Sequence, residues 1–565
     1  MQFFQSGHSF LSPDNTLGFG ITDLVELALV AIVIAALRFR QKCEQVAHAL
    51  SRRTVASMLV LAALPVVLRL ALLAHHAVPT PHIYDEFSHL LVADTLRHFR
   101  LANPPHALHQ FFETFFVIQQ PSYSSIYPIG QGLALAIGWT IFGLPWAGVI
   151  LSVAALCAFV YWMLRGWVAP EWALLGGLFA VFEFGPLSGW MNSYWGGAVT
   201  AFAGCLVFGA LPRLRERARK RDAILLGAGL GIHLLTRPYE SIFLLVSVIL
   251  FFLPEMRSRL QSLRLLRVAP VVVLAVLPAI AVTLVQNKQV TGRWTTLPYQ
   301  LSQYQYGVPM SLTILPNPTP HLPLTREQRL EYISQRSYHG NGTDTPSKFL
   351  ARLRSRVRFY RAFFMAPLYI AFFIFLVTIR SYRYGWLVLT FVLFALGTNL
   401  FPYFYPRYAG AEVCLFILAS VAGLERLSRF KVRGHEAGRQ AAAMLIGLCI
   451  AMFVFRYTLY AVDNANSRPN YRRATYQRLA KMPGKQLVFV HYSPHHVFQH
   501  EWVYNRAEID TAHVVWARDL GRAEDKQLRD YYPHRRCWLF YADAMPPLLT
   551  PYPSTAASSP FLEVP

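Results

Sequence analysis

Charged residues are scarce in this sequence. Only 15% of its 565 residues are Asp, Glu, Lys or Arg, whereas an average soluble domain has about 25%. Hydrophobic residues make up 54% of the chain and aromatic residues 14%. Apolar runs long enough to cross a bilayer core, about 20 residues, recur along most of its length. The composition excludes an ordinary soluble domain and indicates a polytopic α-helical membrane protein.

Acidic residues are scarcer than basic residues. The chain has 30 Asp and Glu against 53 Lys and Arg, for a net charge of +23. Such an excess in a soluble protein suggests nucleic acid, but here it lies in short clusters between apolar runs, as in cytoplasmic loops. We therefore expect no nucleic-acid partner and assign these clusters to the cytoplasm: 38–53, 213–221, 257–267, 380–383 and 426–439.

A cysteine framework and a typical signal peptide are also missing. The six cysteines form no disulfide pattern, because most lie in hydrophobic segments and Cys537 alone lies in the polar tail. The N-terminal stretch "MQFFQSGHSFLSPDNTLGFG" lacks the basic start of a signal peptide. No repeat of solenoid type is visible. The sequence therefore shows neither a disulfide-stabilised domain nor the pattern of a cleaved signal peptide.

The apolar segments predict about 12 transmembrane helices. They are 21–37, 54–74, 129–142, 146–164, 172–188, 195–211, 222–236, 239–253, 268–285, 362–379, 385–400, 409–427 and 441–461. All basic clusters face the cytoplasm only if one segment before 213 does not span. The short, glycine-containing segment 129–142 is the best choice, and we expect it at the outer interface. The N-terminus, the loops 75–145 and 286–358 and the tail after 461 are then extracytoplasmic.

The tail has a different character from the membrane module at 1–461. Its stretches "KQLVFVHYS" (485–493) and "RCWLFYAD" (536–543) read as strands, and "DLGRAEDKQLRDYYP" (519–533) between them reads as a helix with a polar face. We expect a small extracytoplasmic α/β domain over 462–565. Its last residues, 546–565, read as a loose end.

Two adjacent acids follow the second apolar segment, in "HIYDEFSH" (82–89). A carboxylate near a hydrophobic surface can serve as a general base, and Asp85 and Glu86 could both serve one site from its rim. The alternative is that acids at a helix end only cap it. An amphipathic stretch follows, with apolar residues spaced as on one face of a periplasmic helix: Leu90, Leu91, Ala93 and Leu96.

In this region the chain resembles the GT-C superfamily of membrane glycosyltransferases. The resemblance rests on the paired acids after an early apolar segment, an outer amphipathic helix, a "FE" element (112–113) and "YPIGQGL" (127–133). It is closest to the branch of protein O-mannosyltransferases and the lipid A aminoarabinose transferase. It covers mainly 82–145, and the general layout extends it to about residue 461.

The resemblance implies an activity. Members move a sugar from a polyprenyl-phosphate carrier to a hydroxyl on the outer face and invert the anomeric centre. Asp85 matches the family's catalytic acid, with Glu86 beside it, and Glu113 matches the second acid. In the aminoarabinose branch a lysine follows that second acid and meets the donor phosphate, whereas Thr114 follows here. The family's sugar preference therefore cannot be transferred to this chain.

A departing lipid phosphate needs positive charge beside it. Arg237 in "TRPYE" and Arg407 in "FYPRY" are the outer-face candidates, and the alternative for each is interfacial anchoring. Outer aromatic residues could stack on sugars, although Tyr and Trp also form the belt of any membrane protein. The remaining substrate-binding candidates are Tyr123, Tyr127, Tyr194, Trp195 and His109.

No cofactor is certain from the sequence. A divalent ion could bind Asp85, Glu86, Glu113 or His109, although their spacing matches no standard metal motif. The expected partners are a polyprenyl-phosphate sugar, membrane lipids and a glycan, lipid or protein acceptor. We expect a multi-pass protein of a bacterial inner membrane with its active site outside. The alternatives are a transporter or flippase of lipid-linked glycans, which should carry polar features at mid-membrane, and a non-catalytic envelope assembly protein.

Overall fold

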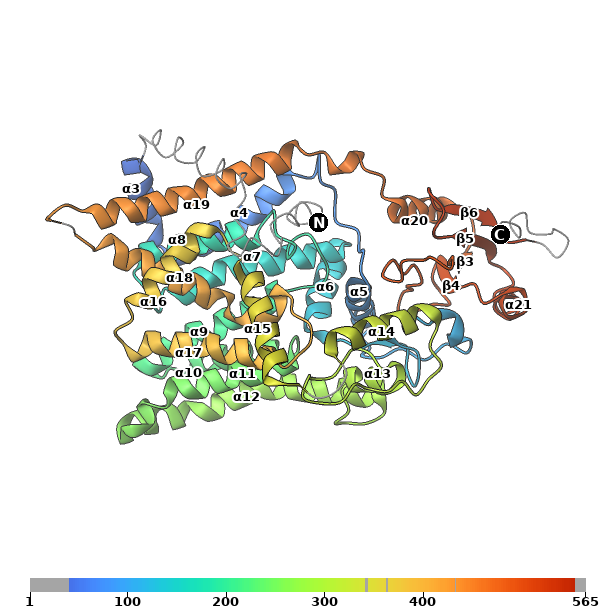
Figure 1. Cartoon of the computed structure of the whole chain (residues 1–565), viewed down its shortest axis with the longest axis horizontal. Helices are drawn as coiled ribbons and strands as arrows, with labels where there is room; N and C mark the ends of the chain where they lie inside the picture. The colour runs from blue at the N-terminus through green and yellow to red at the C-terminus, as the bar shows by residue number, and fades with distance from the viewer. Residues whose placement is uncertain (1–39, 341–343, 362–363, 432, 554–565) are drawn as a thin grey trace. The chain divides into compact units, whose positions relative to one another are not determined.

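The computed structural model describes residues 40–340, 344–361, 364–431 and 433–553 (Figure 1). The expected span at 21–37 and the expected outer N-terminus lie outside these residues. The chain divides into two compact units. The first, which we call the helical unit, comprises Met1–Pro79, Trp146–Ile280 and Asp344–Asn466. The second, the outer-loop unit, comprises Thr80–Pro145, Ala281–Thr343 and Ser467–Pro565.

The helical unit contains nearly all of the expected spans. Its helices are α3 (Arg40–Ser51), α4 (Thr54–Ala71), α7 (Pro145–Leu164), α8 (Pro170–Phe184), α9 (Ala198–Arg217), α10 (Lys220–Leu234), α11 (Pro238–Phe252), α12 (Arg259–Thr291), α15 (Pro346–Arg361), α16 (Ala366–Val377), α17 (Tyr382–Thr398), α18 (Val413–Ser428) and α19 (Ala437–Val462). The 3-10 turn η4 (Pro406–Glu412) leads into α18, and the last turns of α12 belong to the outer-loop unit.

Every expected span within the described residues is helical. In the part of the chain that the structure describes, six helices are long and apolar enough to cross a membrane: Thr54–Ala71, Pro145–Leu164, Ala198–Arg217, Arg259–Thr291, Pro406–Ser428 and Ala437–Ser467. Shorter apolar helices occupy Pro238–Phe252, Ala366–Val377 and Tyr382–Thr398, and also Ile129–Phe142. The chain is therefore a largely helical protein with several apolar helices, and the number of crossings stays a prediction.

Small residues let these helices approach closely, which is the usual way helices pack in a membrane. A Cβ atom added to Gly204 on α9 would lie 2.2 Å from the carbonyl oxygen of Ala411. The backbone of η4 therefore rests directly on α9. This close contact fixes the segment that precedes α18, which carries Arg407.

In the outer-loop unit, α5 (Tyr84–Arg97) packs on α6 (Ile129–Phe142). A Cβ atom on Gly132 would lie 2.2 Å from Val92 Cγ1, so only glycine permits this approach. The expectation of a simple amphipathic helix is wrong for α5, because polar residues on it are buried as well: Ser88, His89, Asp94 and Thr95. They are buried because neighbouring segments cover both sides of the helix.

Short elements complete the outer loops. They are η2 (His109–Phe112), the antiparallel pair β1 (Val117–Ile118) and β2 (Ser124–Ser125), α13 (Pro298–Tyr306) and α14 (Arg326–His339). The Thr325 hydroxyl oxygen caps α14 by accepting a hydrogen bond from Gln328 N, and Gln328 Oε1 accepts one from Thr325 N. This capping box fixes where α14 begins.

A four-stranded sheet forms the C-terminal part of the same unit. Its order is β4 (Val514–Arg518), β3 (Gln486–His491), β5 (Arg536–Tyr541) and β6 (Leu548–Pro551), with β6 alone antiparallel to its neighbour. The helices α20 (Tyr471–Lys481) and α21 (Arg522–Tyr531) accompany it. The two expected strands and the helix between them are β3, β5 and α21. Residues 548–551, which were expected to be loose, form β6 instead.

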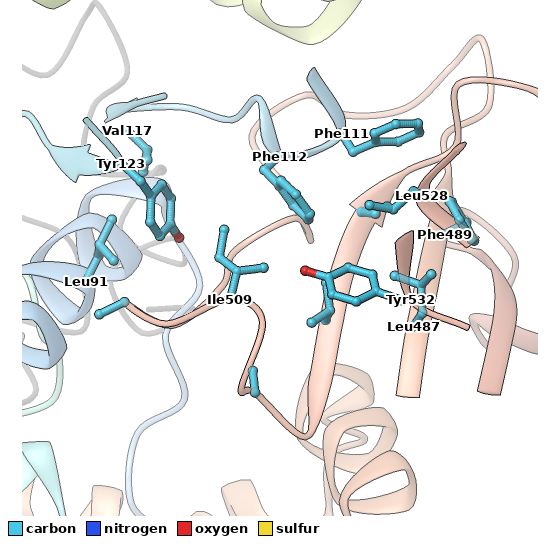
Figure 2. Close-up of a cluster of buried hydrophobic side chains, with 14 of the residues drawn as sticks. Leu91, Phe111, Phe112, Val117, Tyr123, Leu487, Phe489, Ile509, Leu528 and Tyr532 are labelled. Carbon is cyan, nitrogen blue, oxygen red and sulfur yellow. The ribbon is translucent and has the colours of Figure 1, made fainter. Parts of the chain in front are cut away.

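The C-terminal sheet and the first outer loop share one hydrophobic core. Phe111, Phe112 and Tyr123 from the loop pack with Leu487, Phe489 and other residues of the sheet, as Figure 2 shows. The structure therefore groups residues 467–553 with the outer loops, whereas the sequence pattern predicts a separate domain over 462–565. Burial of large aromatic side chains from both segments accounts for the difference, because neither segment covers them alone.

Candidate functional site

The paired acids lie in the first turn of α5, and both are buried. Glu86 Oε2 accepts hydrogen bonds from the backbone N–H of His82 at 2.8 Å and of Ile83 at 3.3 Å. These bonds satisfy donors that a helix start leaves unpaired. Glu86 therefore has the capping function that the sequence left open as the alternative, and it fixes the start of the helix that carries Asp85.

Asp85 is held by a tyrosine from the same outer loop. The Tyr127 hydroxyl donates a hydrogen bond to Asp85 Oδ1. Tyr127 is itself fixed, because its N–H donates to Ser125 Oγ at 3.0 Å and its carbonyl accepts from Gln286 Nε2 at 3.0 Å. The His89 ring stacks on the Tyr127 ring at 4.3 Å. The side chain of Asp85 is thus preorganised by a charge-assisted bond.

Glu113 lies at the end of η2 and meets a different set of neighbours. Gln328 Nε2 donates to Glu113 Oε2 at 3.2 Å, and His109 Nδ1 lies 3.7 Å from Glu113 Oε1. Burial, followed by the Glu113 carboxyl beside it, raises the pKa of Tyr306. Glu113 and His109 are therefore neighbours, as the sequence allowed, in a polar cluster that also includes α14.

Arg518, at the end of β4, joins three segments of the outer-loop unit. Its Nη1 lies 2.6 Å from Glu327 Oε2 on α14, its Nη2 donates to Glu501, and its Nε donates to the Glu113 carbonyl at 2.6 Å. The Arg518, Glu327 and Glu501 side chains are all buried. Burial lowers the pKa of Arg518, but Glu501 and Glu327 outweigh it and raise the value. This buried charge cluster was not predicted.

Thr114 occupies the position where the resemblance would place a lysine. It is buried beside the Tyr504 hydroxyl, and the Tyr504 ring stacks on Phe87 at 4.3 Å. The Arg472 guanidinium lies 4.6 Å from the centre of the Phe87 ring. Burial lowers the pKa of Arg472 to about 10, so it is still a cation at neutral pH. Arg472 is a second cation that sequence reasoning missed.

The candidate metal ligands do not form a metal site in the described part of the chain. Within residues 40–340, 344–361, 364–431 and 433–553, no three His, Cys, Asp or Glu side chains are grouped so that they could hold a metal ion. Asp85 bonds to Tyr127, Glu86 caps α5, and Glu113 faces Gln328 and His109.

In the helical unit, three arginines lie on aromatic rings around the loop 401–408. The Cζ atom of Arg407 is 3.4 Å from the centre of the Trp195 ring, and that of Arg237 is 4.6 Å from Tyr408. Arg356 lies 5.0 Å from Phe404 and donates to the Phe401 carbonyl. We call Arg237, Arg356 and Arg407 the arginine–aromatic group. The contact of Arg407 with Trp195 brings together two residues that the sequence singled out.

Local structure explains why the group gathers there. Arg237 precedes Pro238 at the start of α11, and Arg407 follows Pro406 at the start of η4. Arg356 points inward from α15, where it follows Arg352 by one turn. No local pattern distinguishes Arg356, because Arg354 and Arg358 show the same four-residue spacing in the sequence.

Two other aromatic candidates have their hydroxyl groups bonded within the protein. The Tyr123 hydroxyl donates to the Asn505 carbonyl at 3.1 Å, and its ring belongs to the shared core of Figure 2. The Tyr194 hydroxyl donates to the Pro79 carbonyl at 3.0 Å. Both side chains are almost fully buried. The structure thus gives both a packing role.

Comparison with known proteins gives the fold. Neither the protein-family models nor the curated proteins contain a match to this chain. Among solved structures, ArnT from Cupriavidus metallidurans in the apo state is 11% identical, and the match covers 85% of this chain and 92% of that chain with a TM-score of 0.50. ArnT bound to undecaprenyl phosphate gives 0.49 with the same identity and coverage.

A third similar structure is the oligosaccharyltransferase of Archaeoglobus fulgidus in complex with Zn and sulfate. It is 12% identical, with 81% of this chain and 62% of that chain covered and a TM-score of 0.49. At such low identity the likeness to ArnT establishes the fold and nothing finer. This chain therefore has the fold of ArnT, which agrees with the resemblance read from residues 82–145.

Proposed function

We propose that this protein is an integral-membrane glycosyltransferase that moves a sugar from a polyprenyl-phosphate donor to an acceptor hydroxyl on the extracytoplasmic face. The shared fold with ArnT supports the reaction class, and ArnT from Cupriavidus metallidurans binds undecaprenyl phosphate. The observation that carries the proposal is the buried Asp85 carboxylate, which a fixed tyrosine hydroxyl holds in one orientation.

Asp85 is the general base in this proposal. It accepts the proton of the acceptor hydroxyl while the acceptor oxygen forms a bond to the anomeric carbon of the sugar. The bond from that carbon to the phosphate oxygen breaks, and the polyprenyl phosphate leaves with the electron pair. Attack from the side opposite the leaving group inverts the anomeric centre. A phosphate leaves readily, so the reaction requires no strong general acid.

Glu86 and Glu113 support this chemistry without a direct proton transfer. Glu86 fixes the first turn of α5 through the backbone of His82 and Ile83. Glu113 anchors the end of η2 against Gln328, while the Tyr84 hydroxyl donates to Glu331 on the same helix, α14, at 3.1 Å. Tyr84 and Glu86, the two residues that flank Asp85, are therefore both held by hydrogen bonds, which limits the motion of the base.

The arginine–aromatic group is the proposed partner of the donor phosphate. Arginine suits this role because its planar guanidinium can bind phosphate oxygens through two parallel bonds. The aromatic faces of Trp195 and Tyr408 hold Arg407 and Arg237 at the loop 401–408. Positive charge at this loop would stabilise the phosphate as its negative charge increases during transfer.

The test is a transfer assay with purified protein and a set of polyprenyl-phosphate sugars that differ in sugar and in the configuration of the phosphate linkage. We expect one donor class to be consumed, with release of polyprenyl phosphate and a product of opposite anomeric configuration. NMR of the product gives the configuration. Retention of configuration, or movement of intact donor between leaflets of a proteoliposome without cleavage, would contradict the proposal.

A further inference from the structure

The helix α15 (Pro346–Arg361) has two faces of different character. Its sequence, "PSKFLARLRSRVRFYR", contains six Lys or Arg residues and no acid. Phe349, Arg352, Leu353 and Arg356 are buried or half-buried, whereas the opposite side is exposed. The exposed residues follow the helical repeat: Ser347, Lys348, Leu350, Ala351, Arg354, Ser355 and Val357.

The inner face is anchored to the helical unit. Arg352 Nη1 donates to Asp344 Oδ1 at 3.1 Å, and Asn399 Nδ2 donates to the Phe349 carbonyl at 2.9 Å. Arg356 donates to the Phe401 carbonyl. Arg352 and Arg356 therefore have partners within the protein, and α15 is fixed against the end of α17.

The exposed face combines apolar and basic side chains. Leu350 is 65% exposed and Val357 is 64% exposed, and both lie on one edge of the face. Arg354 and Lys348 follow on the side away from that edge. A hollow of ≈ 440 Å³ lies along this face, lined by Ser347, Leu350, Ala351, Arg354 and Ser355. Hydroxyl groups and a guanidinium thus lie beside an apolar wall.

The neighbours of α15 indicate how deep its exposed face lies relative to the bilayer. The helix ends at Arg361, and the apolar helix α16 begins at Ala366. On its inner side it meets Asn399 and Phe401, just beyond the end of α17 at Thr398. The helix therefore lies where two apolar helices end, which is the level of the bilayer surface. Basic amphipathic helices at that level lie in the interface with their apolar edge among the acyl chains.

We propose that the exposed face of α15 lies in the outer leaflet and binds the phosphate groups of anionic phospholipids through Lys348 and Arg354. Leu350 and Val357 enter the acyl-chain region, while the two cations and the hydroxyl groups of Ser347 and Ser355 meet the head groups. Charge complementarity selects this occupant, because α15 contains no acid and attracts anionic lipid.

The first test uses spin labels in nanodiscs made of equal parts of phosphatidylcholine and phosphatidylglycerol. Labels are attached to Leu350→Cys and Val357→Cys in a chain with Cys43 and Cys537 replaced by Ser. The control is Lys526→Cys, at an exposed position of α21. We expect both α15 labels to be more accessible to oxygen than to a water-soluble nickel complex, and the control to show the reverse. Equal behaviour of all three would overturn the proposal.

The second test addresses the head groups. Spin-labelled phosphatidylglycerol and phosphatidylcholine report lipid association with the wild type and with Lys348→Gln/Arg354→Gln. We expect the double variant to lose roughly tenfold in its preference for the anionic lipid. The control Arg522→Gln/Lys526→Gln on α21 should keep the preference. An unchanged preference in the α15 variant would show that these cations do not bind the lipid.

Discussion

The acids near the start of α5 and the arginines at the loop 401–408 are held in different ways. In the outer-loop unit, acids are fixed by hydrogen bonds: Asp85 by Tyr127, Glu86 by two backbone N–H groups, and Glu327 by Arg518. In the helical unit, Arg237 and Arg407 lie on aromatic rings. A directional bond fixes the orientation of a carboxylate, whereas a ring face holds a cation in place with less constraint on its direction.

This difference suits the two roles that we propose for these residues. A base must present one oxygen to a small proton, so its orientation matters most. A cation that receives a phosphate must tolerate a bulky, charged group whose position changes as it leaves, so an adjustable contact is adequate. The following predictions test whether the acids act through orientation and the arginines through charge.

The largest expected effect is on turnover in Asp85→Asn. The amide cannot accept the proton of the acceptor, so kcat should fall at least a hundredfold. The control is Asp94→Asn, a buried acid on the same helix that accepts from Ala507 N at 2.9 Å. It should lower stability by about 1 kcal/mol and leave kcat nearly unchanged. Equal losses of kcat in both variants would remove the special role of Asp85.

Breaking the buried charge cluster should have the largest effect on stability. Arg518→Gln leaves Glu327 and Glu501 without their cation, which costs about 3–5 kcal/mol. Arg329→Gln, one residue further along α14 from Gln328 and exposed, should cost less than about 1 kcal/mol. Thermal unfolding of the two purified variants measures the difference. A stable Arg518→Gln protein would show that this cluster does not hold the outer-loop unit together.

Removing a cation from the arginine–aromatic group should affect use of the donor. Arg407→Gln or Arg237→Gln should lower kcat/KM for the lipid-phosphate donor more than tenfold, since a charge-assisted bond contributes about 1.5–3 kcal/mol. Arg426→Gln is the matched control, because Arg426 lies 4.6 Å from the Tyr384 ring in the last turn of α18. It should keep normal donor kinetics. A tenfold loss in the control would point to packing instead of phosphate binding.

A smaller effect is expected when Asp85, the proposed base, loses its orienting partner. Tyr127→Phe removes the hydroxyl that donates to Asp85 and should lower kcat about tenfold with little change in donor KM. Tyr123→Phe removes a buried hydroxyl from the same loop, bonded to the Asn505 carbonyl. Steady-state kinetics should show no comparable loss there. The reverse pattern would return Tyr123 to the site.

The smallest effect concerns the sheet edge, where His491 Nδ1 lies 2.7 Å from Asp519 Oδ2. The bond to Asp519 raises the pKa of His491. Burial raises the pKa of the Asp519 carboxyl, but the hydrogen bond with His491 acts in the opposite direction, and the net pKa of Asp519 is lowered. The histidine therefore stabilises the fold below its unfolded pKa, and this contribution is lost as pH rises through its raised value. Thermal unfolding from pH 6 to 8 should show a small decrease that His491→Gln abolishes, with kcat unaffected.

Local sequence patterns predicted the helices and strands well, but they did not predict which side chains contact each other. The apolar segment 129–142 has the same bounds as α6, and the stretches around Val488 and Leu539 form β3 and β5, because periodicity and composition act within one element. The strand β4 was missed, since its apolar run is only four residues long before Arg518. The resemblance to the GT-C superfamily was also visible in the sequence, because residues 82–145 contain its short motifs in the expected order.

The contacts depend on residues far apart in the chain, which no local pattern reveals. Arg518 is separated by 191 residues from Glu327 and by 405 from Glu113. The pairing of Asp85 with Tyr127 was likewise not predicted, although both residues were candidates. Tyr123 shows the opposite error, because an aromatic residue in an outer loop can belong to a core that a distant segment completes.

Chemical rescue tests the central claim most directly. Asp85→Gly removes the carboxylate and leaves space beside the Tyr127 hydroxyl, and added formate can then supply a carboxylate to the acceptor proton. The account predicts that formate restores transfer from the polyprenyl-phosphate donor in a concentration-dependent way, and that Asp94→Gly gains nothing. An Asp85→Gly protein that transfers sugar at the wild-type rate without formate would contradict it.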